Sequence, residues 1–411
     1  MKQKKALLFL LTLIFLFQSL VFGQIKESRV ELLQQELDSV IAPVRESGIT
    51  VCAKVMHADL NKTLYEYKPE TEVIPASITK LITAACSLSK LGQSYNLSTI
   101  VYTDDYNMKE GIINGNLYIK GFGDPDFSSV DLKDLSDNLL KLGIKEITGN
   151  IIADESFFDN DYYTLSNSYK GDTGPSYWPL VNALAFNKNK SRNPALSAAN
   201  ELAGNLTSGG VKMDGTIIEG TTPKGSKEIA KFSHTIYDVL SNMCKESDNH
   251  SAITMFKLVG AKYKDSPGTI SKGQEAIQSF LTELGVDRYS YEILEGSGLT
   301  RYNKVNADMY MKVLKYMYDD RFLFDYFMNA LSIAGKEGTL RNRMIGTQAE
   351  GNVYGKTGTL NGVSSLTGYV IDKDNEVLLF FIVMNGFGGN ANSMRSVQDT
   401  FCETLAGFSG K

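Results

Sequence analysis

The two ends of the chain carry complementary parts of one mixed layer of helix and strand. Near the N-terminus, one helical pattern precedes two strand patterns, over residues 28–46, 49–56 and 64–67. Near the C-terminus, three strand patterns precede a helical one, over residues 353–359, 367–371, 377–384 and 393–405. We therefore predict an α+β fold whose main layer is assembled from segments far apart in the sequence.

Residues 93–232, between these two parts, have a different pattern. Glycine recurs at turn positions, and short apolar strands are predicted at 117–119 and 147–152. Helical periodicity is convincing only over 127–142 and 194–206. Because such strands need a core of their own, we predict that this segment is an inserted domain and not a linker.

Composition limits the classes of function. The chain has 411 residues, of which 43% are apolar, so it can bury a sizeable core. A formal charge of −5 argues against a nucleic-acid surface. Only three histidines (His57, His234 and His250) and no Cys-x-x-Cys pair are present, so we expect neither a metal nor a cofactor.

The N-terminus has the layout of an export signal. Three lysines within the first five residues precede an apolar run over 6–17, which is short for a membrane span. We predict a signal peptide over residues 1–23, cleaved between Gly23 and Gln24, and a periplasmic or otherwise extracytoplasmic location. An uncleaved membrane anchor is the alternative.

The four cysteines are widely spaced and lie in apolar surroundings. Cys52, Cys86, Cys244 and Cys402 are therefore predicted to be small core residues and not a disulfide framework. A bridge between Cys52 and Cys402 stays open as an alternative, because both elements belong to the same predicted layer.

Ser77 and Lys80 begin an apolar helical pattern that runs to residue 91. Their spacing places both side chains on one helix face. A serine hydroxyl becomes a nucleophile when a base removes its proton, and burial can lower the pKa of a lysine enough for it to be that base. Alone, such a pair is more typical of an N-capping serine followed by a surface lysine. Here the small, apolar neighbours favour a buried lysine.

Ser247, Asp248 and Asn249 lie between helical patterns at 236–245 and 251–259, so we expect them on an interhelix loop. The Ser247 hydroxyl can relay a proton, and the Asn249 amide can bind a substrate carbonyl. A simple N-cap for the second helix is the alternative.

The third motif, Lys356-Thr357-Gly358-Thr359, lies on a predicted strand. The lysine and the two hydroxyls can hold a terminal carboxylate, and Gly358 can let a substrate backbone approach the strand. The backbone N–H groups of Ser77 and Thr359 can together form an oxyanion hole. The alternative is an exposed lysine that protects a strand edge.

A Ser-His-Asp triad would be the competing mechanism for acyl transfer. No Gly-x-Ser-x-Gly elbow with plausible partners is present, and no histidine has a strong case as a base. The ordered Ser/Lys, Ser/Asn and Lys/Thr/Gly motifs therefore carry the prediction.

These motifs resemble those of the D-alanyl-D-alanine carboxypeptidase/endopeptidase family of class C low-molecular-mass penicillin-binding proteins. The resemblance extends over nearly the whole mature chain, in residues 75–83, 121–125, 149–159, 182–189, 296–299, 338–343 and 356–369. One departure is Glu295, which stands where the family commonly has aspartate.

The resemblance implies a β-lactamase/transpeptidase-like catalytic domain, an antiparallel sheet packed with helices, interrupted by a large strand-rich inserted domain. The catalytic domain would comprise residues 24–92 and 233–411, and the inserted domain residues 93–232. The implied reaction is serine-type hydrolysis of D-Ala-D-Ala termini, or of D-Ala crosslinks, in peptidoglycan stem peptides. β-Lactam antibiotics would be covalent inhibitors.

The implied roles follow the three motifs. Ser77 would be the nucleophile and Lys80 its base, with Ser247 and Asn249 in the substrate cleft. Lys356, Thr357 and Thr359 would hold the substrate carboxylate.

Two other functions are weighed against this one. A serine β-lactamase would need a group that hydrolyses the acyl-enzyme quickly, and no clear glutamate-containing loop motif provides it. A non-catalytic sensor that binds peptidoglycan or β-lactams would be favoured if a catalytic residue were missing. The preference for carboxypeptidase or endopeptidase action, the oligomeric state and a peripheral membrane association stay open.

Overall fold

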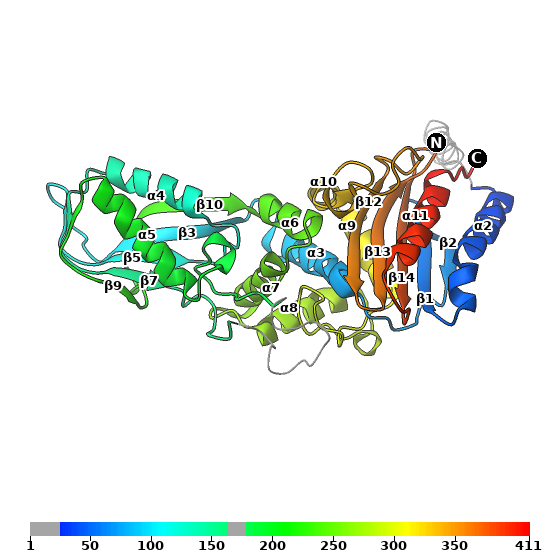
Figure 1. Ribbon diagram of the computed structural model, residues 1–411, viewed down its shortest axis with the longest axis horizontal. Coiled ribbons are helices and arrows are strands. Elements are labelled where there is room, and N and C mark those ends of the chain that lie inside the picture. Colours follow the sequence, from blue (N-terminus) through cyan, green and yellow to red (C-terminus); the bar gives the residue numbers. More distant parts are fainter. Residues whose placement is uncertain (1–24, 163–177) are drawn as a thin grey trace, which may run out of the picture.

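Strands from both ends of the chain form one antiparallel sheet in the computed structural model, which describes residues 25–162 and 178–411 (Figure 1). The strand order is β11-β12-β13-β14-β1-β2. The strands are β1 (Thr50–His57), β2 (Lys62–Tyr67), β11 (Ser332–Ile333), β12 (Val353–Leu360), β13 (Val363–Ile371) and β14 (Val377–Asn385). Since β1 pairs with β14, the predicted α+β layer is confirmed. The predicted signal peptide, residues 1–23, lies outside the described residues.

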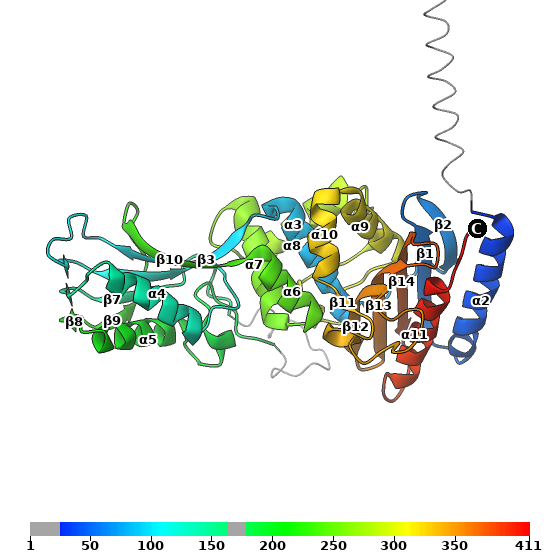
Figure 2. The same ribbon diagram turned by 90° about the horizontal axis from the view of Figure 1, so that it is seen from above.

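Helices cover both faces of this sheet (Figures 1 and 2). The outer face carries α2 (Glu27–Glu46) and α11 (Asn392–Ala406). The other face meets a helical group: α3 (Thr79–Leu91), α6 (Ile236–Lys245), α7 (Asn249–Lys264), α8 (Ile270–Glu283), α9 (Ala307–Asp319) and α10 (Arg321–Asn329). Neighbouring residues of β14 point to opposite cores: Phe380 packs with α2 and α11, and Phe381 packs with the helical group.

The segment from β3 to β10 forms two further sheets at the other end of the elongated molecule (Figure 1). The five-stranded sheet, in the order β10-β3-β5-β7-β9, contains β3 (Asn96–Thr103), β5 (Leu117–Gly121), β7 (Ile151–Asp154), β9 (Ile217–Glu219) and β10 (Lys227–Thr235). The small parallel sheet contains β4 (Ile112–Ile113), β6 (Glu146–Ile147) and β8 (Lys212–Met213). Together with α4 (Ser129–Lys141) and α5 (Pro194–Ser208) they enclose a separate apolar core.

The single strand predicted over 147–152 is wrong. β6 and β7 belong to different sheets, and the chain turns between them at Gly149. A Cβ on this glycine would lie 2.4 Å from the Gly115 carbonyl oxygen, so the two backbones approach more closely than any other residue allows. Local periodicity does not report such a long-range contact.

The four cysteines are free and buried, as the core interpretation predicts. The alternative bridge between Cys52 and Cys402 is excluded. Cys52 packs in the core of the helical group and Cys402 in the core under α2 and α11, so the sheet separates them. Within the described residues, no helix combines the length and apolar character that crossing a bilayer requires.

Candidate active site

Ser77 lies in a single 3₁₀ turn, Ala76–Ile78, directly before α3. The sequence predicted one continuous helix from residue 77, whereas the turn is distinct and Ala76 has a left-handed φ of +52°. Such a conformation is unusual for alanine and marks a locally strained backbone. The Lys80 Nζ lies 3.0 Å from the Ser77 Oγ, so the two side chains share a face as predicted.

Lys80 is fully buried on α3. Its ammonium donates to the Ser77 Oγ, to the Asn249 Oδ1 at 2.7 Å and to the Ser297 carbonyl at 2.7 Å. Burial lowers the pKa of Lys80 to about 8, against the opposing charges of Glu295 and Asp248. A substantial neutral fraction near neutral pH suits a general base.

The second motif lies between α6 and α7. Ser247 has a left-handed φ of +59°, and Asp248 is the N-cap of α7, since its side chain accepts from the Ser251 N–H at 3.1 Å. Asn249 is the first residue of α7, although the sequence predicted it on the loop. Because its Oδ1 accepts from Lys80, its amide N–H groups are left to face a ligand.

Lys356 is fully buried on β12, so the alternative of an exposed edge lysine is excluded. Its Nζ donates to the Ser247 Oγ at 2.9 Å and to the Thr357 carbonyl at 2.8 Å. Burial, and then the nearby charge of Lys80, lower the pKa of Lys356 to about 7. The first and second motifs meet through Lys80, and the second and third through Lys356.

Gly358 has a different neighbour from the one expected. A Cβ at this position would lie 2.7 Å from the Pro75 carbonyl and 2.9 Å from the Ser77 nitrogen, and closer still to the Ser365 Oγ. The glycine therefore lets residues 75–77 pack closely against one face of β12, and that face of the strand is not open to a substrate backbone. The contact brings the Ser77 N–H beside β12, where Thr359 follows.

The two threonine hydroxyls of the third motif already have partners. The Thr357 hydroxyl donates to the Thr339 Oγ1 at 2.8 Å, and the Thr359 hydroxyl accepts from Arg395 at 3.4 Å. β11 pairs only with Tyr354 and Gly355, so the outer edge of β12 beyond them has no partner strand among the described residues.

Sequence reasoning missed a loop that supports Lys80. The fully buried Glu295 carboxylate accepts from the backbone N–H groups of Ser297 at 2.6 Å and Gly298 at 2.7 Å. These bonds fix the Ser297 carbonyl where Lys80 donates to it. An acidic residue directly before Gly-Ser-Gly was the available signal, because a short loop of this kind exposes N–H groups to a carboxylate.

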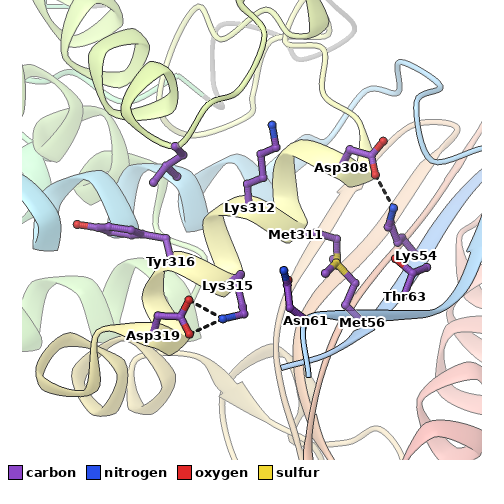
Figure 3. Close-up of a pocket in the computed structure, with 11 residues that line it drawn as sticks. Lys54, Met56, Asn61, Thr63, Asp308, Met311, Lys312, Lys315, Tyr316 and Asp319 are labelled. Carbon is purple, nitrogen blue, oxygen red and sulfur yellow. Dashed lines mark hydrogen bonds and ion pairs between the residues drawn. The ribbon is translucent and has the colours of Figure 1, made fainter. Parts of the chain in front are cut away.

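A separate cavity of about 630 Å³ lies between α9 and the β1–β2 end of the sheet (Figure 3). Lysine and acidic side chains, including the Lys54–Asp308 pair at 2.7 Å, surround Met56 and Met311. None of the residues of the three motifs lines this cavity.

Comparisons with known proteins identify the family of the chain. The model of the D-Ala-D-Ala carboxypeptidase 3 (S13) family matches residues 33–192 and 186–406. A D-alanyl-D-alanine carboxypeptidase from Actinomadura sp. (strain R39) is 27% identical over 468 residues, covering 93% of this chain and 86% of the relative.

Solved structures share the fold. The crystal structure of penicillin binding protein 4 from Haemophilus influenzae has a TM-score of 0.77 at 22% identity, covering 92% of this chain and 99% of the other. A predatory endopeptidase from Bdellovibrio bacteriovorus, in complex with an immunity protein, has a TM-score of 0.58 at 18% identity, covering 87% and 94%. The predicted catalytic fold with its strand-rich insertion is thereby confirmed.

Proposed function

The chain belongs to the D-Ala-D-Ala carboxypeptidase 3 (S13) family, and from this membership we propose that Ser77 is the nucleophile of its reaction. It is a serine hydrolase of the penicillin-binding carboxypeptidase/endopeptidase type. The observation that carries the assignment of Ser77 is the buried Lys80 ammonium, 3.0 Å from its hydroxyl and with a pKa of about 8.

The acylation step begins when neutral Lys80 takes the Ser77 proton. The Ser77 Oγ then forms a bond to the carbonyl carbon of the penultimate D-Ala, and the charge that develops on the carbonyl oxygen is stabilised by the N–H groups of Ser77 and Thr359. As the C–N bond breaks, the proton that Lys80 took from Ser77 passes through the Ser247 hydroxyl to the leaving D-Ala amine, and Lys80 becomes neutral again. Water attacks the ester, with Lys80 as base, and regenerates Ser77.

The substrate can be bound by the N–H and O–H donors of the three motifs that take no part in the proton transfers. Lys356 uses two of its three N–H bonds on Ser247 and Thr357, so the third can meet the terminal carboxylate of the substrate. The Thr357 hydroxyl can donate to the substrate once it releases Thr339, whereas the Thr359 hydroxyl only accepts from Arg395 and can donate its own proton. The outer edge of β12 at Gly358 accompanies the substrate backbone. The Asn249 amide donates to a peptide carbonyl.

The same site accounts for β-lactam binding, because a strained lactam carbonyl carries a carboxylate close by, as the D-Ala terminus does. We further propose that residues 1–23 direct export to the periplasm or another extracytoplasmic compartment, where peptidoglycan lies. The division into residues 24–92 with 233–411, and an inserted domain at 93–232, is likewise our proposal.

One experiment tests the assignment. Mature protein is incubated with labelled penicillin and, separately, with a peptide that ends in D-Ala-D-Ala or carries a D-Ala crosslink. We expect a stable adduct on Ser77, release of D-Ala or of the crosslinked amine, and loss of both in Ser77→Ala, a variant that should keep its fold. Rapid loss of the label without release of D-Ala would indicate a β-lactamase, and no adduct at all would contradict both enzymes.

A further inference from the structure

The second motif is held in place by a residue of the inserted segment, residues 93–232. The Lys188 Nζ forms an ion pair with the Asp248 carboxylate at 2.8 Å and donates to the Ser251 Oγ at 3.3 Å. The same ammonium pairs with Asp126, another residue of the inserted segment. Asp126 in turn accepts from the Asn242 side chain of α6 at 2.9 Å.

Lys188 sits in an unusual backbone turn. Asn187, Lys188 and Asn189 have left-handed φ angles of +50°, +56° and +51°. Residues other than glycine adopt this conformation singly and at a cost in free energy. Three in succession therefore persist only where surrounding contacts hold the turn in place. Such strain is found preferentially at functional sites.

The turn is anchored through the Asn189 side chain. Its amide donates to the Leu180 carbonyl at 2.9 Å and lies 3.0 Å from the His250 Nε2, while its oxygen accepts from the Phe186 N–H at 2.9 Å. His250 follows directly after Asn249 in α7. The turn therefore contacts the second motif region at two points, Asp248 and His250.

Asp248 depends on this contact for its charge balance. Its side chain is only 19% exposed, and burial, the largest single influence, raises its pKa. The charge and the hydrogen bond of Lys188, together with smaller contributions from His250 and the Ser251 N–H, outweigh burial and hold the pKa below its usual value. Without Lys188, the carboxylate would keep the Ser251 N–H and a 3.4 Å contact with Asn242 as its polar partners. A partly buried carboxylate without a cation favours rearrangement of its loop.

We propose that Lys188 is a positioning residue for the reaction: from the inserted segment it fixes Asp248, and thereby sets the placement of Ser247 and Asn249 on either side. The inserted segment thus completes the active site and is not an independent appendage. This inference rests on the roles proposed above for Ser247 and Asn249.

The test compares Lys188→Met, Lys188→Arg and a matched control, Lys190→Met, which removes an exposed lysine two residues away. For each folded variant, the rate of Ser77 acylation by labelled penicillin and the kcat and KM for a D-Ala-D-Ala peptide are measured. We expect Lys188→Met to slow acylation about tenfold to a hundredfold, mainly through kcat, since small displacements of catalytic groups cost this much. The acylation rate of Lys188→Arg should lie within about threefold of the wild-type rate, and the rate of Lys190→Met should equal it.

A double-mutant comparison separates positioning from general loss of stability. Asp248→Asn keeps an N-capping oxygen but removes the charge. In that background, Lys188→Met should lower the acylation rate by no more than about twofold. If Lys188→Met does not fold, Lys188→Gln, which keeps an amide donor, replaces it in both backgrounds.

Two outcomes would overturn the inference: wild-type acylation in Lys188→Met, or a loss that is equally large in the wild-type and Asp248→Asn backgrounds. Absence of an adduct in the wild-type protein would instead contradict the proposed function itself, so the two failures are distinguishable.

Discussion

Two lysines are fully buried in the site, and among the described residues neither is paired with a carboxylate in an ion pair. Lys80 and Lys356 instead donate to hydroxyl, amide and carbonyl oxygens. Burial of an ammonium costs free energy, so both lysines lower the stability of the folded chain, as expected where side chains serve the proposed reaction. With a pKa of about 8, roughly a tenth of Lys80 is neutral at pH 7, which is the form that its proposed role as base requires.

The lowered pKa of Lys356 predicts a pH-dependent stability. The folded pKa is about 7 and the usual value 10.5, so the unfolded chain binds the proton more tightly. The contribution of Lys356 to stability is full above 10.5 and is lost as the pH falls through about 7. Between about pH 7 and pH 10.5, the free energy of unfolding of wild type should rise by about 1.4 kcal/mol per pH unit relative to that of Lys356→Met.

Thermal unfolding of both proteins from pH 6 to pH 9 measures this difference. The exposed Lys373→Met variant is the control and should run parallel to wild type. A constant difference between wild type and Lys356→Met over this range would contradict the prediction.

At the scale of elements, the site depends on how closely β12 passes the turn before α3. The Gly358 position leaves no room for a side chain between the strand and Pro75, Ser77 and Ser365. The sheet thereby sets the distance between Ser77, the proposed nucleophile, and the third motif.

Gly358→Ala is expected to separate these two elements. The added Cβ would lie within 3 Å of backbone atoms of Pro75 and Ser77, so the strand or the turn must shift. We expect acylation by penicillin to fall about a hundredfold and stability to fall by about 1–3 kcal/mol. Gly388→Ala, where a Cβ meets nothing within 4 Å, is the matched control. Acylation of Gly358→Ala within threefold of wild type would contradict this account.

The elements with strong periodicity were predictable from sequence. The helix at 236–245 is α6 to the residue, and the closing helix at 393–405 is one residue shorter at each end than α11. The strand predicted at 367–371 begins four residues late, because β13 is buried at every residue except the last and lacks the expected alternation.

The rest of the site depends on tertiary contacts that local patterns do not report. The structure brings the three motifs together as expected, through Lys80 and Lys356. Glu295 and Lys188 were not predicted as part of the site. Glu295 acts through the Ser297 carbonyl, which meets Lys80 only after the chain folds, and Lys188 pairs with Asp248, which is distant in sequence. Lys188 lies within residues 182–189 and Glu295 directly before residues 296–299, two segments that resemble the family, but the resemblance gave neither residue a role.

At the scale of the whole molecule, the chain returns from the five-stranded sheet of the inserted segment to the helical group where β10 leads into α6. His234, near the end of β10, lies 2.9 Å from a carboxylate oxygen of the buried Asp124 and faces Asp131 at 3.9 Å. The hydrogen bond to Asp124 raises the pKa of His234 to about 9, despite partial burial, and Asp131 and Asp126 add to the effect. Since Asp126 also contacts Lys188, this junction and the second motif share one network of charges.

His234 predicts a pH dependence opposite in sign to that of Lys356. Its pKa rises on folding from 6.5 to about 9, so its contribution to stability is full below 6.5 and is lost as the pH rises through about 9. The melting temperature of wild type should therefore exceed that of His234→Gln by several degrees near pH 6.5, and the difference should shrink by pH 9.5. His57→Gln is the control, because burial lowers the pKa of His57, so that its contribution rises slightly just above pH 6.5, then stays level, and does not fall near about pH 9. A difference in melting temperature that stays constant up to pH 9.5 would show that His234 and Asp124 do not form a stabilising ion pair at this junction.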